Sequence, residues 1–454
     1  MSSADGKVPQ REKIAYGIGC LGQNMIYTYF GTFLLYFYTE IFGLLPAAAG
    51  ILLLVARIWD AVNDPMMGVL VDRTKTRWGK FRPYLLFSPI FFAIIAVLCF
   101  SVPPFSAAGK LVYAYITYIL FGMIYTASDV PYWAMSGAIT VDAQERNSIV
   151  MFPRFVGTIG AAVATIGTLP LIYLFRDLTN GNVVAGYQLT AAFFGLITIG
   201  CFLITFFFVK ERVTSTNKKK ASWSTISEAI FKNKPLMIVI ISGFFSGVAQ
   251  TAKLQALIYY AAYNLQSEAL YTLLVGINIP FLLIGIMLVP FFTKRLGKKG
   301  TYIAANIIYA VSSIGFFLSG WNNFTVIVIW NCIGSFAMGI PLVIQTSMIA
   351  DTIEYVELKT GERSEGTIFS TQTFLAKLTA AATSGLIGVL LAILGFKAGA
   401  TQSQSVLQGI HQVTSLLPFF ASMLAFITML LYPLSEKEHA KIVQELEDRQ
   451  MIKD

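Results

Sequence analysis

The sequence predicts an all-α membrane protein with twelve transmembrane helices in two bundles of six. Of its 454 residues, 56% are hydrophobic and only 13% are charged, which is more apolar surface than a water-soluble domain needs. A helix that spans a bilayer requires about 20 mainly apolar residues. Stretches of about that length occur at 14–40, 47–71, 83–102, 110–139, 150–175, 186–209, 236–263, 269–293, 300–319, 324–349, 367–395 and 407–432.

The breaks between these stretches alternate in charge. Lys and Arg gather at 72–82, 210–235 and 294–299, and are missing from 41–46, 103–109 and 320–323. Loops on the cytoplasmic side of a membrane carry the excess of basic residues. We therefore expect both termini in the cytoplasm, and a multi-pass protein of the bacterial inner membrane in contact with lipid.

The basic segment in the middle of the chain divides it into two similar halves. We expect an N-terminal bundle over 1–209, a cytoplasmic central loop over 210–235, a C-terminal bundle over 236–432 and a cytoplasmic tail over 433–454, partly an amphipathic helix. Both halves have a basic break between their second and third helices. Such a repeat is typical of a two-bundle transporter with alternating access.

Ionisable side chains at bilayer depth are costly and indicate function. The stretch 47–71 holds Asp60, Asn63 and Asp64, which share one helical face because they are spaced by three and four residues. Two carboxylates this close do not both ionise without a cation, so the group predicts a site for Na⁺ or a shared proton. The alternative is that both acids form structural salt bridges with Arg57 or Lys377.

The stretch 110–139 contains the run Tyr125-Thr126-Ala-Ser-Asp129-Val-Pro-Tyr-Trp133. Asp129 and Trp133 are four residues apart and therefore neighbours on a helix. A carboxylate accepts hydrogen bonds from hydroxyls, and an indole face stacks on a pyranose ring, so the pair predicts a sugar site. Arg154 begins the next helix, where it would contact the sugar or close the cytoplasmic side of the cavity.

Two lysines lie inside apolar stretches of the second half. Lys377 would offset the charge of the acids in the first half, unless it snorkels to a helix end. Lys253, near Gln250 and Gln255, lies far from any acid of its own half. It indicates an anionic group on the ligand, although snorkelling or a bridge to Asp129 explains it equally well.

The segment that follows residue 349 is rich in acids, among them Asp351 and Glu354, and it also holds Arg363. We expect it to face the basic loops near Arg146 and Arg295. Ion pairs there would hold an inner gate shut and break when the protein opens inward. A merely solvated run of charges is the alternative.

The remaining composition excludes other classes of function. The chain has four cysteines and two histidines, too scattered for a metal or catalytic cluster, and it has no nucleotide-binding loop. We therefore expect neither an enzyme nor a cofactor, and the tail is too short for the output domain of a sensor. The net charge of +9 lies in alternate loops, which argues against nucleic acid as a partner.

Taken together, these runs resemble the glycoside-pentoside-hexuronide:cation symporter family of the major facilitator superfamily, which includes the melibiose carrier. The resemblance extends from about Lys13 to the last helix. It rests on Ala56-Arg-Ile-Trp-Asp60-Ala-Val-Asn63-Asp64-Pro65, Gly68 to Gly79, Arg77-Trp-Gly-Lys-Phe-Arg-Pro83, Tyr125 to Trp133, Pro153-Arg154-Phe155, Ala350-Asp351-Thr352, Gln372-Thr373 and Lys377.

This resemblance implies a major facilitator fold and symport of a glycoside, pentoside or hexuronide with Na⁺ or H⁺. It implies a cation site of Asp60, Asn63, Asp64 and Thr126, and sugar contacts from Asp129, Trp133, Arg154, Thr373 and Lys377. We add Tyr125, Lys253 and Asn24 to the expected sugar site. Where the melibiose carrier has an acid preceded by a lysine, this chain has Asn24 preceded by Gln23, so its sugar is left open. A proton-coupled antiporter of drugs or metabolites on the same fold is the alternative function.

Overall fold

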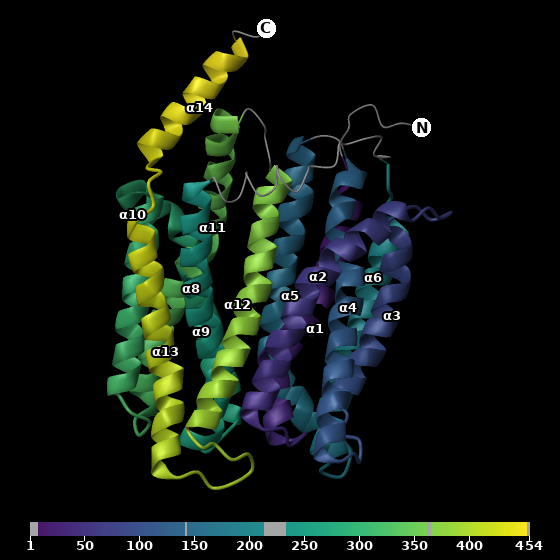
Figure 1. Cartoon of the computed structure of the whole chain (residues 1–454), viewed down its shortest axis with the longest axis vertical. Coiled ribbons are helices and arrows are strands. Elements are labelled where there is room, and N and C mark those ends of the chain that lie inside the picture. The colour runs from purple at the N-terminus through teal and green to yellow at the C-terminus, as the bar shows by residue number, and fades with distance from the viewer. Residues whose placement is uncertain (1–7, 141–142, 213–232, 361–364, 452–454) are drawn as a thin grey trace. The chain divides into compact units, whose positions relative to one another are not determined.

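The computed structural model describes residues 8–140, 143–212, 233–360 and 365–451, and every named element over these residues is a helix. The chain divides into two compact units, the first formed by residues 1–218 with 396–400 and the second by 219–395 with 401–454. Figure 1 shows the long helices of each unit running alongside one another. The expected all-α fold is confirmed.

The first unit contains the six helices α1 (Gln10–Glu40), α2 (Pro46–Arg73), α3 (Arg82–Cys99), α4 (Ala107–Ile139), α5 (Ala143–Leu178) and α6 (Val183–Phe208). Helix α1 packs against α5 and α6, and α4 packs against α2 and α3. Glycines allow the closest approaches, because a Cβ on Gly160 of α5 would lie 2.4 Å from the carbonyl oxygen of Leu21 on α1.

The second unit contains α8 (Lys234–Tyr259), which continues as the π-helix η1 (Tyr260–Asn264), followed by α9 (Ala269–Met287), α10 (Val289–Leu318), α11 (Phe324–Thr360), α12 (Glu365–Ile393), α13 (Gln404–Leu430) and α14 (Glu436–Met451). Helix α8 packs against α13 and α12, and α11 packs against α9 and α10.

Ten helices are long and apolar enough to cross a membrane over their described residues, and Pro46–Ala56 of α2 forms a shorter apolar run. Two boundaries differ from the expected spans. Helix α11 continues through the acidic segment to Thr360, because charged side chains at the end of a span are solvated without breaking a helix. Helix α9 ends at Met287, and the break expected near 294–299 is a kink at Gly297 inside α10, where φ is +70°.

Each unit contains a glutamate that caps a basic segment, which lies between α2 and α3 in the first unit and at the kink inside α10 in the second. In the first unit the Glu211 carboxylate accepts the N–H groups of Lys80, Phe81 and Arg82 at 2.8, 2.8 and 3.0 Å, at the start of α3. In the second, Glu436 accepts the N–H of Lys298 just after Gly297. A carboxylate is stabilised at such a place by the free N–H groups and the helix dipole. Both glutamates follow the last long helix of their unit.

Gly79 has a positive φ of +113°, and a Cβ built on it would lie 2.6 Å from a carboxylate oxygen of Glu211. We expect Gly79→Ala to destabilise the protein by about 1–2 kcal/mol from backbone strain and by about 1–3 kcal/mol more from overpacking. Gly181→Ala is the matched control, because φ there is +82° but nothing lies within 4 Å of its Cβ. Thermal unfolding in detergent measures both, and equal melting temperatures for the two variants would contradict the close contact with Glu211.

Candidate cation and substrate site

The expected cation residues of α2 meet α4 over two successive turns. Thr126 Oγ1 donates a hydrogen bond of 2.8 Å to Asp64 Oδ1. One turn earlier, the Asp60 carboxylate lies against Gly122, where an added Cβ would be 2.4 Å from Asp60 Oδ1. Both pairs are spaced by four residues on their helices, so α2 and α4 run in the same direction and stay in register along this contact.

Most of these groups are buried, and Asp64 is half-buried. Asp60 is 4% exposed, Asn63 is also buried, and Thr126 is fully buried. The Asn63 amide nitrogen is buried without a hydrogen-bond partner among the described residues, whereas the side chain of Arg57, a possible salt-bridge partner, lies outside them.

The donor set is chemically that of a site for a small cation. Two carboxylates, the hydroxyl of Thr126 and the amide oxygen of Asn63 are all hard oxygen ligands, the kind that alkali and alkaline-earth cations prefer. Two acids so close also share a proton readily, because a single proton relieves their repulsion. The arrangement can therefore bind a monovalent cation or a proton.

A second polar group lies on α4 beyond Thr126. Asp129 Oδ1 accepts hydrogen bonds from Trp133 Nε1 at 3.0 Å and from Gln23 Nε2 of α1 at 2.8 Å. Asp129 is 7% exposed and Gln23 is 2% exposed. The i, i+4 spacing of Asp129 and Trp133 thus brings the two side chains together.

Gln23 was not among the expected site residues. Its Oε1 is buried and has no hydrogen-bond partner in the described part of the chain, so it is an acceptor without a donor beside the Asp129 carboxylate. A polar residue in the middle of an apolar helix was the available signal. Gly122 was also missed, since a glycine in a membrane helix carries no chemical signal of its own.

Other expected residues of the first unit lie around this group. The Arg154 guanidinium of α5 is 5.5 Å from the centre of the Trp133 ring, at the distance of a cation–π contact. Tyr125 packs against Tyr27 with ring centres 5.0 Å apart. Asn24 donates its amide to the carbonyl of Cys20 on its own helix at 2.9 Å.

The two expected lysines of the second unit have different surroundings. The Lys253 ammonium lies 3.1 Å from the centre of the Phe316 ring of α10, and that ring is 1% exposed. Lys253 therefore packs on a buried aromatic side chain inside the unit. Lys377 is buried on α12, and the side chain of Thr373 lies outside the described residues.

Some of the charges expected to form a gate lie among the described residues. Asp351 of α11 pairs with Lys298 of α10, whose Nζ lies 2.6 and 2.8 Å from the two carboxylate oxygens. Arg295, which precedes the kink at Gly297, lies over the Phe291 ring at 4.4 Å. The side chain of Arg146 and all of Arg363 lie outside the described residues.

Residues 15–436 match the family model described as MFS/sugar transport protein. The chain belongs to this family. It is therefore a multi-pass membrane transporter of the major facilitator superfamily and not an enzyme, and the resemblance to glycoside-pentoside-hexuronide:cation symporters is confirmed.

Relatives in the family share about a third of the sequence over nearly the whole length. The chain is 36% identical to the uncharacterized symporter YnaJ of Bacillus subtilis (strain 168), covering 98% of this chain and 96% of the relative. It is 32% identical to the isoprimeverose transporter of Lactiplantibacillus pentosus, with 97% and 92% covered. It is 33% identical to a putative sulfoquinovose importer of Escherichia coli (strain K12), with 98% and 95% covered.

The fold is also similar to that of solved transporters. The crystal structure of the nucleoside transporter NupG matches with a TM-score of 0.61 at 14% identity, covering 93% of this chain and all of the other. At this level of identity the likeness concerns the fold alone.

The contact between Asp60 and Gly122 gives a direct test of the cation site. We expect Gly122→Ala to weaken cation binding about tenfold, because its methyl group displaces the Asp60 carboxylate by overpacking. Na⁺-dependent thermal stabilisation of purified protein, titrated at several pH values, measures the affinity.

Gly200→Ala on α6 is the matched control, since a Cβ there has nothing within 4 Å. Unchanged cation affinity in a folded Gly122→Ala protein would exclude Asp60 from the cation site.

Proposed function

We propose that this transporter is a symporter, which carries a sugar and a monovalent cation, Na⁺ or H⁺, together into the cell by alternating access of its two units. The observation that supports this most is the order of side chains on α4. Gly122, Thr126, Asp129 and Trp133 are spaced by four, three and four residues, so they follow one face of the helix. The first two contact the acids of α2, and the last two form the polar group with Gln23.

The shared face of α4 explains how binding of the cation is coupled to binding of the sugar. A monovalent cation bound between Asp60 and Asp64 offsets one of their two negative charges, relieves their repulsion and tightens the contact between α2 and α4. Because Asp129 is one turn from Thr126 on the same rigid helix, the position of the sugar-binding carboxylate depends on that contact. Linkage requires that the sugar tighten cation binding by the same factor.

The orientation of the chain in the membrane is inferred from the charges at its helix ends. The basic breaks near Arg82 and Lys298 and the acidic end of α11 belong to one side of the membrane by the positive-inside rule. We propose that this side is the cytoplasm, that both termini lie there, and that the membrane is the inner membrane of a bacterium.

Among sugars, we propose a neutral glycoside. Asp129 and the Gln23 Oε1 are both acceptors, and hydroxyl groups are the donors that a neutral sugar offers to them. A buried carboxylate at the same place repels an anionic substrate. The ammonium of Lys253, which would favour an anion, packs on Phe316. The relative named an isoprimeverose transporter fits this choice, and the putative sulfoquinovose importer is the contrasting case.

Replacing Asp64 tests symport itself. In proteoliposomes with a cation gradient, we expect Asp64→Asn to abolish accumulation of sugar while exchange of labelled for unlabelled sugar continues, because coupling is lost and binding is not. Asp177→Asn is the control, since Asp177 is exposed and pairs with its neighbour Arg176 at 2.8 Å. Cation-driven accumulation that survives in Asp64→Asn contradicts the proposal, as does movement of sugar and cation in opposite directions through the unaltered protein.

Replacing Gln23 tests the sugar site. Gln23→Met keeps the size of the side chain but removes the donor to Asp129 and the buried acceptor, so we expect about 10-fold to 100-fold weaker binding of a neutral glycoside, the cost of about one to two hydrogen bonds with an ionised group. Isothermal titration with isoprimeverose and with sulfoquinovose measures both affinities.

Gln188→Met is the matched control for this experiment. Gln188 donates to Ser101 at 2.8 Å near the ends of α3 and α6, away from the polar group of α1 and α4. Equal affinities in the two variants would exclude Gln23 from the sugar site, and tighter binding of the sulfonated sugar in the unaltered protein would overturn the choice of a neutral substrate.

A further inference from the structure

The tail helix α14 is fixed to the end of the second unit by polar and apolar contacts. It starts with a capping box, in which Ser435 N–H and Oγ both donate to Glu438 at 2.8 Å and Glu438 N–H donates back to Ser435 Oγ at 3.3 Å. These hydrogen bonds hold the pKa of Glu438 below its usual range. Leu434 and Ile442 join the apolar cluster that contains Ile353 and Val356 of α11.

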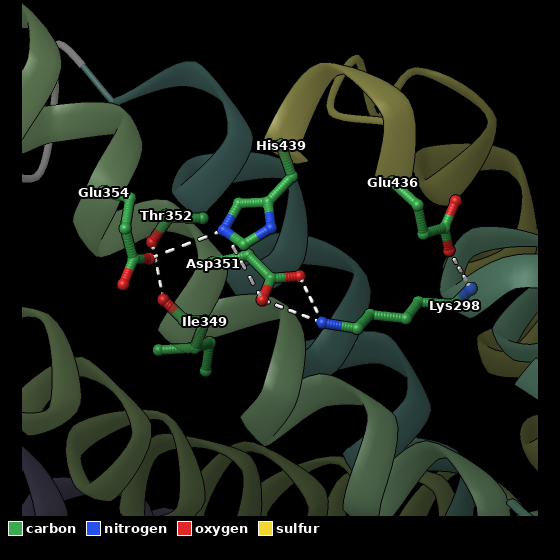
Figure 2. A network of polar contacts seen from close by, with 7 residues as sticks. All are labelled: Lys298, Ile349, Asp351, Thr352, Glu354, Glu436 and His439. Atoms are coloured by element: carbon green, nitrogen blue, oxygen red, sulfur yellow. Dashed lines mark hydrogen bonds and ion pairs between the residues drawn. The ribbon is translucent and has the colours of Figure 1, made fainter. Parts of the chain in front are cut away.

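His439 of α14 projects from this helix toward two acids of α11 (Figure 2). Its Nε2 lies 3.5 Å from Glu354 Oε2 and 3.9 Å from Asp351 Oδ1. The same nitrogen is buried and has no hydrogen-bond partner among the residues that the structure describes. A protonated imidazole at this place is attracted by two carboxylates, whereas a neutral one lacks that attraction between opposite charges.

The other charged groups around His439 are already engaged. Lys298 of α10 holds Asp351 with its ammonium and Glu436 with its backbone N–H. Lys299 donates to the carbonyls of Leu430 and Tyr432, both at 2.8 Å. Burial raises the pKa of the Tyr432 phenol, and the nearby negative charges of Asp351 and Glu436 raise it further. Lys298 and Lys299 thus contact other groups, and Glu354 faces the His439 imidazole.

We propose that His439 is a proton-operated latch, which binds α14 to the end of α11 when the imidazole is protonated and releases it when the imidazole is neutral. Imidazole is the side chain that changes its charge between about pH 5 and 8. In the orientation proposed above, the latch senses the pH of the cytoplasm. In acid it ties α10, α11 and α14 together through Lys298, Asp351 and His439, and we expect the stiffened end of this unit to slow the transport cycle.

The docking of α14 is measurable without any substrate. Two exposed positions can carry spin labels, Asn322→Cys in the turn between α10 and α11 and Lys441→Cys on α14. Pulsed electron paramagnetic resonance measures the distance between the two labels. The cysteines Cys20, Cys99, Cys201 and Cys332 are buried, and serines replace them in this protein. We expect the ratio of docked to undocked α14 to rise about threefold to tenfold from pH 8 to pH 5.5, the effect of one or two partly exposed ion pairs.

Two variants of His439 make the test decisive. His439→Gln stays neutral, so the distance distribution should no longer depend on pH; His439→Arg stays charged, so α14 should remain docked up to pH 8. A pH-dependent distance that persists in His439→Gln overturns the proposal, and so does a distance that does not change with pH in the unaltered helix.

Transport gives the second readout. In proteoliposomes we expect sugar exchange, which needs no cation gradient, to slow severalfold when the pH on the side of α14 falls to 5.5, and this slowing should vanish in His439→Gln. Exchange that is equally sensitive to pH in both proteins overturns the regulatory role. Because the proposed function rests on exchange and accumulation in Asp64→Asn, its failure would be seen there and leaves the distance measurement unaffected.

Discussion

The structure depends on the need to satisfy carboxylates inside helices that lie in lipid. An ionised acid at bilayer depth is tolerated only where neighbouring helices supply donors, a cation or a proton. In the first unit this need brings three helices together. Thr126 of α4 donates to Asp64 of α2, and Gln23 of α1 donates to Asp129 of α4. The hydrogen bonds that hold α1, α2 and α4 together are therefore also the contacts that position the side chains of the site.

Small residues allow these helices to approach closely enough for such hydrogen bonds. Asp60 reaches α4 only because position 122 lacks a side chain, and α5 reaches α1 only because position 160 does. In lipid there is little hydrophobic force between helices, so association relies on close packing and on hydrogen bonds. Gly122 serves both, since the close approach that it allows also brings an acid of α2 to the turn before Thr126.

Charges at the helix ends have a different physical role from those in the interior. Glu211 and Glu436 cap breaks in the two units at corresponding places, and each is associated with a glycine of positive φ. Lys298 and Asp351 form an ion pair within the second unit. These contacts pair basic and acidic groups at the helix ends, and they fix the tail helix α14 to the end of the second unit.

The sequence by itself determined what depends on composition and on spacing along one helix. Apolar length predicted the spanning helices, loop charge predicted the basic side, and the four-residue spacing of Asp129 and Trp133 was enough for their contact, because helix geometry alone places them together. The kink at Gly297 and the continuation of α11 through its acidic end were not evident, since hydropathy reports lipid contact and not backbone hydrogen bonding.

Only the tertiary structure decided which side chains of different helices meet. Gln23 faces Asp129, Asp60 faces Gly122, Lys253 lies on Phe316, and Asp351 pairs with Lys298. Each of these contacts depends on how one helix is rotated and shifted against another. That choice is made by the packing of whole faces, to which every residue along the contact contributes, and no short stretch of sequence contains it.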